Sequence, residues 1–549
     1  MRSPWKALLF CVVAGAVLVG CHSSAPSGQS TPPPGGGTNP PPSSGSTDVV
    51  TYHNDNARTG QNLNETTLTP ANVNSTSFGK IATLSVDGKV DAEPLYLSAL
   101  SVNGATHNVL YVVTEHDSVY AFDADSGTVL WQKSMLPSGE TTSDVRSCSQ
   151  VVPEIGITAT PVIDRSAGSH GTIYLVAMSK DGSGTYHQRL HALDATNGAE
   201  EFGGPTVVQA SYPGTGDNAT AGRVVFDPGQ YEERSGLLLM NGVIYTAWTS
   251  HCDNRPYTGW VISFDAATLQ QKSVLNVTPN GNEGAIWMAG AGPAADSSGN
   301  IYVLDGNGTF DGTVDSNGFP TQKDFGNGFL KFSTTSGQLA VADYFEMSNQ
   351  MQENDTDIDL GSGGAMVLPD LKDGSGNVKH LAAGAGKDQN IYIVNRDDMG
   401  KYDSNANHVY QEIQGQLSGS VFSMPAYFNN TIYYGSVGDN IKAFPITNAQ
   451  VATTPKSKSA HTFGYPGATP SISANQSSDG IVWVTENSSP AVLHAYDATD
   501  LSREIYNSSQ ASGGRDNFGN GNKFITPMIV NGKVYVGTTN GVGVFGLLH

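Results

Sequence analysis

One short motif recurs along the chain, an apolar strand that ends on a small or polar residue before a turn. Successive copies end 49 to 71 residues apart. Their last residues are Asp123, Asp194, Asp265, Ser333, Asn395, Pro445, Asp497 and Gly546. Further apolar segments precede each copy, so each one predicts a small antiparallel sheet. Sheets of this size cannot cover their own apolar faces and have to pack against copies of themselves.

The first copy shows how such a sheet is built. Residues 110–131 read LYVVTEHDSVYAFDADSGTVLW and predict three antiparallel strands joined by two turns. In the second turn, we expect Asp123 and Asp125 to accept hydrogen bonds from backbone amides and Gly127 to adopt a positive φ. The first turn carries the charged residues 115–117, which we expect at the surface.

Eight copies favour an all-β fold, an eight-bladed β-propeller of four-stranded antiparallel blades, because radial repetition leaves only short and protected sheet edges. The sequence stops just after the third strand of the last copy. A strand at residues 78–86 is therefore predicted to complete the last blade and close the ring. Two stacked β-sandwiches are the alternative, but a sandwich does not require eight copies of one signature.

The first 47 residues predict an export signal and a tether. An apolar run at residues 7–18 follows two basic residues and precedes Cys21, a pattern that resembles a bacterial lipoprotein signal cleaved before a lipidated cysteine. An ordinary secretory signal and a short membrane helix are the alternatives, although a run of about 12 apolar residues is short for crossing a bilayer. The predicted parts are a signal peptide at residues 1–20, a Ser/Pro/Gly-rich tether at 21–47 and the propeller at 48–549.

Cysteine usage and charge limit the chemistry and the partners. After loss of Cys11 with the signal and lipidation of Cys21, only Cys148 and Cys252 remain, and outside the cytoplasm they can form one disulfide. Two buried free thiols are the alternative. A net charge of -22 and the lack of a basic run exclude a nucleic-acid partner. The predicted location is extracytoplasmic, on the bacterial cell envelope, with the lipid anchor as the sole membrane contact.

The turn at residues 121–131 and its weaker copy at 192–198 resemble the repeat of the quinoprotein dehydrogenase superfamily. The segments YHNDNARTGQN, SHCDNRPYTGW and GAGPAADSSGNIYVLDGNGTFD resemble secreted bacterial proteins of the PQQ-like kind. The resemblance covers residues 48–549. It implies an eight-bladed propeller, in a superfamily that contains both enzymes carrying pyrroloquinoline quinone (PQQ) and non-catalytic scaffolds.

Three positions match functional residues of these enzymes. The resemblance implies that Asn307 is a cofactor contact and calcium ligand, that Asp357 is the catalytic base with a part in calcium binding, and that Lys387 contacts the quinone. Oxygen ligands suit calcium. Other parts of the pattern are missing, since the chain lacks vicinal cysteines and carries Thr356 where the enzymes have tryptophan. Trp260 and Trp287 are expected to pack between blades.

Two hypotheses of function follow. The first is a lipid-anchored propeller that acts as a binding or scaffold module for a protein or carbohydrate partner in the cell envelope, without intact quinoprotein catalysis. The loops of the third to fifth blades would form its contact face. The alternative is a periplasmic alcohol or sugar dehydrogenase that depends on PQQ and Ca²⁺, with Asp357 as its base.

Overall fold

The chain divides into two units, residues 1–38 and 39–549, and the computed structural model describes residues 47–548 of the second. The predicted signal peptide, Cys21 and nearly all of the tether lie outside the described residues. Within residues 47–548, no helix has the length and apolar character that a bilayer crossing requires.

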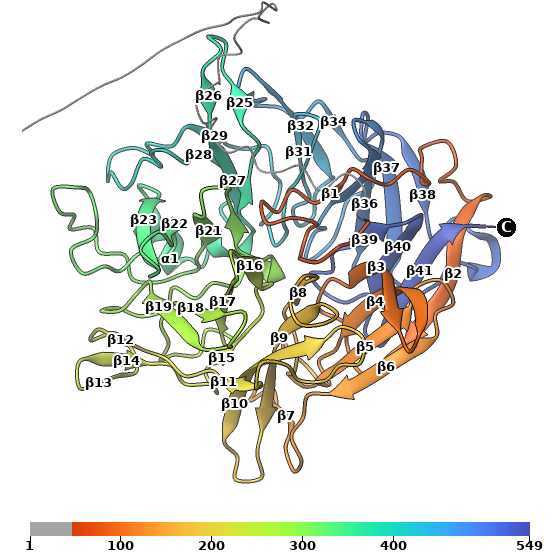
Figure 1. Ribbon diagram of the computed structural model, residues 1–549. Helices are drawn as coiled ribbons and strands as arrows, with labels where there is room; N and C mark the ends of the chain where they lie inside the picture. Colours follow the sequence, from red (N-terminus) through yellow and green to blue (C-terminus); the bar gives the residue numbers. More distant parts are fainter. Residues whose placement is uncertain (1–46, 549) are drawn as a thin grey trace, which may run out of the picture. The chain divides into compact units, whose positions relative to one another are not determined.

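The regular structure of the described chain consists mainly of antiparallel sheets that follow one another in chain order (Figure 1). Within residues 47–548, eight sheets hold four or five strands each. The first sheet contains β3 (Leu95–Val102), β4 (Ala105–Val113), β5 (Ser118–Asp123) and β6 (Val129–Ser134). The second contains β7 (Thr141–Thr142), β8 (Val162–Asp164), β9 (Thr172–Lys180), β10 (Tyr186–Asp194) and β11 (Thr206–Val207).

The next three sheets lie in the middle of the sequence. The third contains β15 (Tyr231–Glu232), β16 (Leu238–Met240), β17 (Val243–Ser250), β18 (Trp260–Asp265) and β19 (Gln271–Asn276). The fourth contains β20 (Ala294–Ala295), β21 (Ile301–Leu304), β22 (Phe329–Ser333) and β23 (Ala340–Phe345). The fifth contains β24 (Met366–Val367), β27 (Leu381–Ala385), β28 (Ile391–Asn395) and β29 (Gln411–Ile413).

Of the last three sheets, the seventh and the eighth each include a strand from the start of the described chain. The sixth contains β30 (Ala426–Phe428), β31 (Thr431–Tyr434), β32 (Lys442–Thr447), β33 (Gln450–Val451) and β34 (Ser457–Lys458). The seventh contains β35 (Ser471–Asn475), β36 (Ser478–Glu486), β37 (Val492–Asp497) and β38 (Glu504–Asn507), with β1 (Gln61–Asn62) parallel to β35. The eighth contains β2 (Phe78–Ser85), β39 (Met528–Val530), β40 (Lys533–Gly537) and β41 (Gly541–Leu547).

Smaller elements lie in the segments that connect the strands of the eight sheets. Two small sheets contain β12 (Ser211–Pro213), β13 (Ala219–Thr220) and β14 (Arg223–Val225), and β25 (Leu371–Lys372) with β26 (Val378–Lys379). The short helix α1 spans Gln350–Asp355, and 3₁₀ turns lie at Met288–Gly290, Leu360–Ser362 and Ser512–Gly514. β2 runs antiparallel to β41, with Phe78 opposite Leu547 and Ser85 opposite Gly541, so the first long strand and the last one share a sheet.

The recurrent motif coincides with one strand in each of the eight sheets. Its final residue is also the last residue of β5, β10, β18, β22, β28 and β37. In the turn after β5, the Asp123 carboxylate accepts hydrogen bonds from the amides of Asp125 and Ser126, and Gly127 has a φ of 73°. The Asp125 carboxylate accepts instead from the side chains of Asn108 and Lys533, so its predicted role in the turn is replaced by contacts to other strands.

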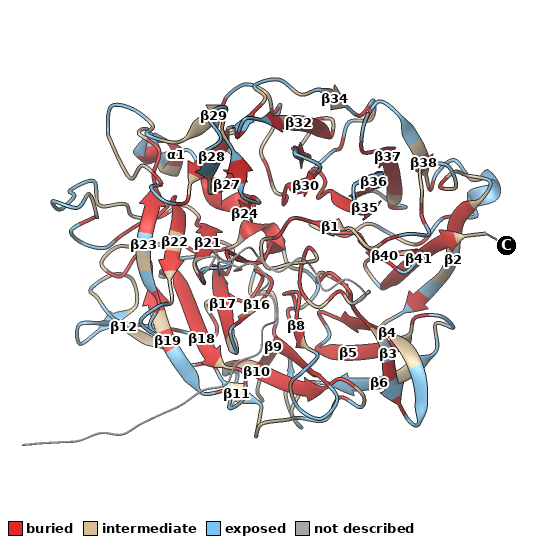
Figure 2. Cartoon of the chain, turned by 45° about the horizontal axis from the view of Figure 1, so that its top comes forward, coloured by how far each residue is buried: buried red, intermediate tan, exposed pale blue. Residues whose placement is uncertain are grey.

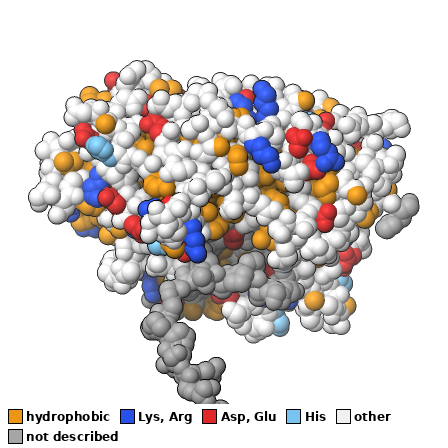
Figure 3. Space-filling model, turned by 90° about the horizontal axis from the view of Figure 1, so that it is seen from above, with side chains coloured by type: hydrophobic (Ala, Val, Ile, Leu, Met, Phe, Trp, Pro, Cys, Tyr) orange, Lys and Arg blue, Asp and Glu red, His pale blue; other side chains and the backbone are white. Residues whose placement is uncertain are grey.

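The buried residues lie mainly along the middle strands of the sheets (Figure 2), and most of them are apolar. The largest buried cluster extends from the third sheet to the sixth without interruption, so each of these sheets covers its neighbour. In the first sheet, the outer strand β6 is largely exposed while β5 is buried. On the face shown in Figure 3, Lys and Arg side chains lie close to Asp and Glu side chains among uncharged ones.

Candidate functional site

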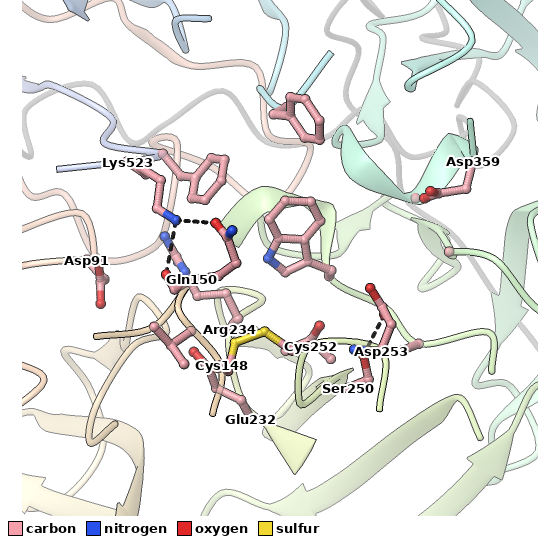
Figure 4. Close-up of a pocket in the computed structure, with 18 of the residues that line it drawn as sticks. Asp91, Cys148, Gln150, Glu232, Arg234, Ser250, Cys252, Asp253, Asp359 and Lys523 are labelled. Carbon is pink, nitrogen blue, oxygen red and sulfur yellow. Dashed lines mark hydrogen bonds between the residues drawn. A yellow bond between two sulfur atoms is a disulfide. The ribbon is translucent and has the colours of Figure 1, made fainter. Parts of the chain in front are cut away.

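A cavity of about 430 Å³ is lined by loops from several sheets (Figure 4). Many of its polar side chains occupy one structural position, the end of the second long strand of a sheet or the residues just after it. The residues at this position are Glu115 after β4, Ser250 at the end of β17, Asn307 after β21 and Lys387 after β27. Since the strands repeat, the residues that follow them converge on one place.

The three positions predicted from the family resemblance lie together in this cavity. Lys387 Nζ is 2.5 Å from Asp357 Oδ1 and 2.6 Å from Asp359 Oδ1. Asn307 Nδ2 donates to the same Asp357 Oδ1 at 2.7 Å. The cluster therefore holds one cation between two carboxylates, with an amide against one of them.

The local backbone fixes this cluster. Asp357 has a φ of 56° just after α1, and the amide of Lys387 donates to the carbonyl of Asp359 at 2.9 Å. Gly386 permits this close approach, because a Cβ there would lie 2.4 Å from Leu360 Cα. The Asp359 side chain is 6% exposed and that of Asp357 is 72% exposed, so the two carboxylates differ strongly in solvation.

Burial and charge oppose each other at this cluster. Burial raises the pKa of Asp359 above its ordinary value, although the neighbouring Lys387 ammonium lowers it in part. Burial alone would lower the pKa of Lys387, but the carboxylates of Asp359 and Asp357 outweigh burial, and its pKa is raised. Lys387 therefore stays charged at neutral pH and holds both aspartates in place.

Asn307 presents an unused acceptor to the cavity. Its Oδ1 is buried and has no hydrogen-bond partner, while its Nδ2 is bound to Asp357. A buried carbonyl oxygen without a partner costs free energy, of the order of 1–3 kcal/mol. This atom is suited to accept a hydrogen bond from a ligand or to coordinate a cation.

Flat and sulfur-containing groups also line the cavity. Trp287 packs its indole edge-to-face against Phe524 at 5.1 Å and against Phe422 at 5.9 Å, and all three rings line the space. Cys148 and Cys252 form a disulfide with a Cα–Cα distance of 5.9 Å, and both cysteines line the same cavity (Figure 4). The three rings and the disulfide thus give this part of the cavity wall an apolar character.

A second charged group lies elsewhere on the cavity wall. Arg234 donates from Nη1 to the Thr158 carbonyl at 3.1 Å, but its buried Nη2 has no hydrogen-bond partner. Lys523 Nζ donates to the carbonyl and the side chain of Gln150 at 3.0 and 2.8 Å (Figure 4). Burial, with the repulsion of Lys89, lowers the pKa of Lys523. Burial and the Asp91 carboxylate raise the pKa of Glu232 to about 7, against the opposing effect of Arg234.

Two sequence-based expectations about side-chain positions are wrong in part. The turn at residues 115–117 is exposed only at His116, because Glu115 is 4% exposed and faces the cavity, and Asp117 is 0% exposed. Trp287 lines the cavity rather than packing between sheets, whereas Trp260 is fully buried in the core as expected. No sequence motif marks Arg234 or Lys523, which lie on irregular segments. The position just after a strand end is the signal that marks Glu115.

The cavity does not gather three ionisable metal ligands. Within the described residues, the only group of three His, Cys, Asp or Glu side chains close enough to share an ion is His461, Glu486 and His494, outside the cavity. Beside Asn307 Oδ1, a cation near Lys387 would find the two aspartates that already contact this lysine, and Glu115 Oε2 is a further buried oxygen without a partner on the cavity wall.

Comparison with known proteins gives matches by structure alone. No family model matches the sequence, and no curated protein matches it. Among solved structures, quinohemoprotein alcohol dehydrogenase from Comamonas testosteroni has a TM-score of 0.59 and 13% identity, covering 91% of this chain and 80% of the other. The quinohemoprotein alcohol dehydrogenase of Pseudomonas putida HK5 has a TM-score of 0.59, 12% identity and the same coverage.

A europium-containing methanol dehydrogenase is also similar, with a TM-score of 0.54, 12% identity and coverage of 90% of each chain. At 12–13% identity, similarity of structure establishes a shared fold and does not carry an activity. The all-β structure, with its many four-stranded antiparallel sheets, therefore has the PQQ-type propeller fold of these dehydrogenases.

Proposed function

We propose that the cavity binds a planar, anionic quinone cofactor of the PQQ kind and that the protein oxidises an alcohol or a sugar. The observation that carries this proposal is the meeting of Trp287, Asn307, Asp357 and Lys387 in one cavity, in a fold shared with quinohemoprotein alcohol dehydrogenases. The enzyme hypothesis thus replaces the scaffold hypothesis as the preferred one. The scaffold hypothesis remains the second candidate.

The cavity residues fit such a cofactor. A volume of about 430 Å³ is within the range of small-molecule sites, roughly 300–1,000 Å³. PQQ is flat and carries several carboxylates, so it needs a planar surface and cations. The indole of Trp287 offers the surface, and Lys387, Lys523 and Arg234 offer the cations. The unpartnered Nη2 of Arg234 is an available donor for a ligand carboxylate.

The fit to calcium is incomplete. In the described part of the cavity, the buried oxygens without a hydrogen-bond partner include Asn307 Oδ1 and Glu115 Oε2, while both Asp357 and Asp359 already contact Lys387. Ca²⁺ takes six to eight oxygen ligands, which these residues do not supply by themselves. The roles proposed for the residues of this cavity do not require a bound cation.

The residues of the chain suggest a division of roles. A bound quinone would supply the two-electron acceptor for alcohol oxidation. Asp357 Oδ1 is held by Lys387 and Asn307, so Oδ2 is the oxygen that would take the proton of a substrate hydroxyl. Lys387 would stabilise negative charge beside the quinone, with the buried Asp359 fixing its position. Phe422, Phe524 and Tyr465 would limit the access of water, since they line the same space.

Reconstitution tests this proposal. Purified protein is incubated with PQQ, with and without Ca²⁺, and alcohol-dependent reduction of an electron-acceptor dye is measured. We expect activity in the wild type, a loss of at least about a hundredfold in Asp357→Asn because general bases contribute this much, and no change in Asp355→Asn, a nearby exposed aspartate. Activity that is equal in both variants would exclude Asp357 as the base.

One observation favours the second candidate, a non-catalytic binding or scaffold module. Both cavity aspartates are ion-paired with Lys387, and no three ionisable ligands meet there within residues 47–548. In this case the loops of the third to fifth sheets would contact a protein or carbohydrate partner in the cell envelope. Cofactor binding without any turnover, over a panel of alcohols and sugars, would support this candidate against the enzyme.

We further propose that the eight sheets form the eight blades of a closed ring. The support is the chain order of the sheets and the pairing of β2 with β41.

For location we propose an extracytoplasmic protein with Cys21 as its lipid anchor. The disulfide supports this location, since disulfides persist in oxidising compartments. Mass spectrometry of the mature N-terminus would detect a diacylated Cys21; an unmodified N-terminus after a different cleavage site would rule the anchor out.

A further inference from the structure

A second cluster of ligating side chains lies on the seventh sheet, outside the cavity. His461 Nε2 is 3.1 Å from Glu486 Oε2, and His494 Nε2 is 3.5 Å from the same oxygen. The ligand atoms of the three side chains all lie within 4.8 Å of one another. None of these residues lines the cavity described above.

The register of the sheet explains how two of them meet. On β36 and β37, Val484 is opposite His494, and Glu486 is two residues beyond Val484 on the same strand. Since side chains alternate between the faces of a strand, Glu486 and His494 project from one face as diagonal neighbours. His461 comes from the segment between β34 and β35, where its carbonyl accepts hydrogen bonds from Ser459 Oγ at 2.8 Å and Asn440 Nδ2 at 3.0 Å.

The imidazole nitrogens that face the cluster have Glu486 as their polar neighbour. The Nε2 atoms of His461 and His494 are both buried, and the same Glu486 oxygen lies 3.1 and 3.5 Å from them. His494 is 3% exposed, and its other nitrogen, Nδ1, contacts Glu504 Oε1 at 2.7 Å. A proton on Nδ1 that is donated to Glu504 leaves the lone pair of Nε2 directed at the cluster. A carboxylate behind a histidine is the usual outer partner of a metal-bound imidazole.

The surroundings suit a bound ion. The imidazoles of His461 and His494 stack at 4.7 Å, and Phe463 packs edge-on against both, at 4.8 and 5.2 Å. The cluster thus brings two imidazoles and one carboxylate together beside an aromatic ring. Ligand atoms bound about 2.0–2.2 Å from a tetrahedral zinc ion lie about 3.3–3.5 Å apart. The two measured distances, 3.1 and 3.5 Å, are close to this separation.

We propose that His461, Glu486 and His494 bind one Zn²⁺ ion, with Glu504 positioning His494. Two nitrogens and one carboxylate form a donor set that suits zinc, while calcium and magnesium require oxygen ligands. The side chains of His461 and Glu486 are 38% and 27% exposed, so water can fill the fourth position. The ion would fasten the segment that carries His461 to β36 and β37. This site is separate from the proposed cofactor cavity and does not depend on it.

Zinc titration of the full-length protein tests the proposal. After treatment with a chelator, Zn²⁺ is added in a calorimeter, and Co²⁺ is added to a second sample to record its visible absorption. We expect one zinc ion per chain, a higher melting temperature with zinc, and the spectrum of tetrahedral Co²⁺. We expect His461→Ala to bind at least about a hundredfold more weakly, and Glu504→Gln about ten- to a hundredfold more weakly with an altered Co²⁺ spectrum.

Matched variants keep the test decisive. His408 is an exposed histidine that contacts Asp403, so His408→Ala is the control and should bind zinc like the wild type. If His461→Ala fails to fold, Glu486→Gln replaces it, because this change keeps the shape of the side chain. The proposal is overturned if the wild type binds no zinc, or if the chosen ligand variant binds it as tightly as the His408 control.

Discussion

The ion pair of Lys387 with Asp359 allows a quantitative prediction that does not depend on any cofactor. In Lys387→Met, the buried Asp359 loses the ammonium that lies 2.6 Å from its Oδ1. Breaking a buried pair by removal of one partner costs about 3–5 kcal/mol. We take about 3 kcal/mol, because the Lys387 side chain is itself 18% exposed. The exposed Asp357 adds little to this figure, since exposed pairs contribute at most about 1 kcal/mol.

This cost converts into a melting temperature. Unfolding entropy near the transition is about 2.1 cal/mol/K per residue, so roughly 500 described residues give about 1 kcal/mol/K, and a loss of about 3 kcal/mol lowers the melting temperature by about 3 °C. Differential scanning calorimetry measures the shift. The shift should be larger at pH 8 than at pH 5. Burial already raises the pKa of Asp359, and without Lys387 it rises further, so a proton can neutralise the carboxylate at the lower pH.

A double variant separates the ion pair from other effects of the substitution. Lys387→Met combined with Asp359→Asn should recover most of the lost stability, because no unpaired buried charge remains. Lys372→Met, on the exposed side of β25, should leave the melting temperature unchanged. A shift that is the same at both pH values, or a double variant as unstable as the single one, would show that Lys387 does not stabilise the charged form of Asp359.

Three further predictions concern stability. Replacing Cys148 and Cys252 by serine opens a loop of about 100 residues, which lowers the free energy of unfolding by about 5 kcal/mol and the melting temperature by about 5 °C. An unchanged melting temperature would mean that the disulfide does not stabilise the folded state. Glu232 has a pKa raised from 4.5 to about 7. The contribution of Glu232 therefore lowers the free energy of unfolding of the wild type by about 3 kcal/mol as the pH rises from 4.5 to 7. Glu232→Gln should abolish this decrease, which melting curves recorded from pH 4 to 8 would measure. Phe78→Ala should cost about 3–5 kcal/mol, since the Phe78 ring is fully buried against Tyr506 and Trp483; no change in melting temperature would show that β2 adds no stability.

Much of the β-structure could be predicted from the sequence because it rests on a local pattern. Asp123, Asp194 and Asp265 end strands at the positions that the motif predicts. An aspartate at a tight turn can accept hydrogen bonds from the backbone amides of the turn, and this local interaction is visible in the sequence. The small sheet of β12, β13 and β14 had no such signal. Its strands are two or three residues long and hold together by contacts between loops rather than by a periodic pattern.

The site was predictable only in part. Asn307, Asp357 and Lys387 were found because each lies in a recognisable segment, but their mutual distances depend on how neighbouring sheets pack. Trp287 was expected in the core, because the residues around a tryptophan in the sequence do not show whether its ring packs in the core or lines a cavity. The guanidinium of Arg234 packs against Gly290, where a side chain would leave no room for it. The spacing of residues in the sequence does not reveal such a contact.

Binding of PQQ tests most directly whether the cavity is a site for a planar anionic quinone. Equilibrium dialysis with the wild type should give saturable binding of one PQQ per chain at micromolar concentration. Trp287→Leu should bind about tenfold more weakly, because an aromatic contact contributes about 1 kcal/mol or more. Binding that does not saturate, or that is as tight in Trp287→Leu and Lys387→Met as in the wild type, would show that the cavity is not such a site.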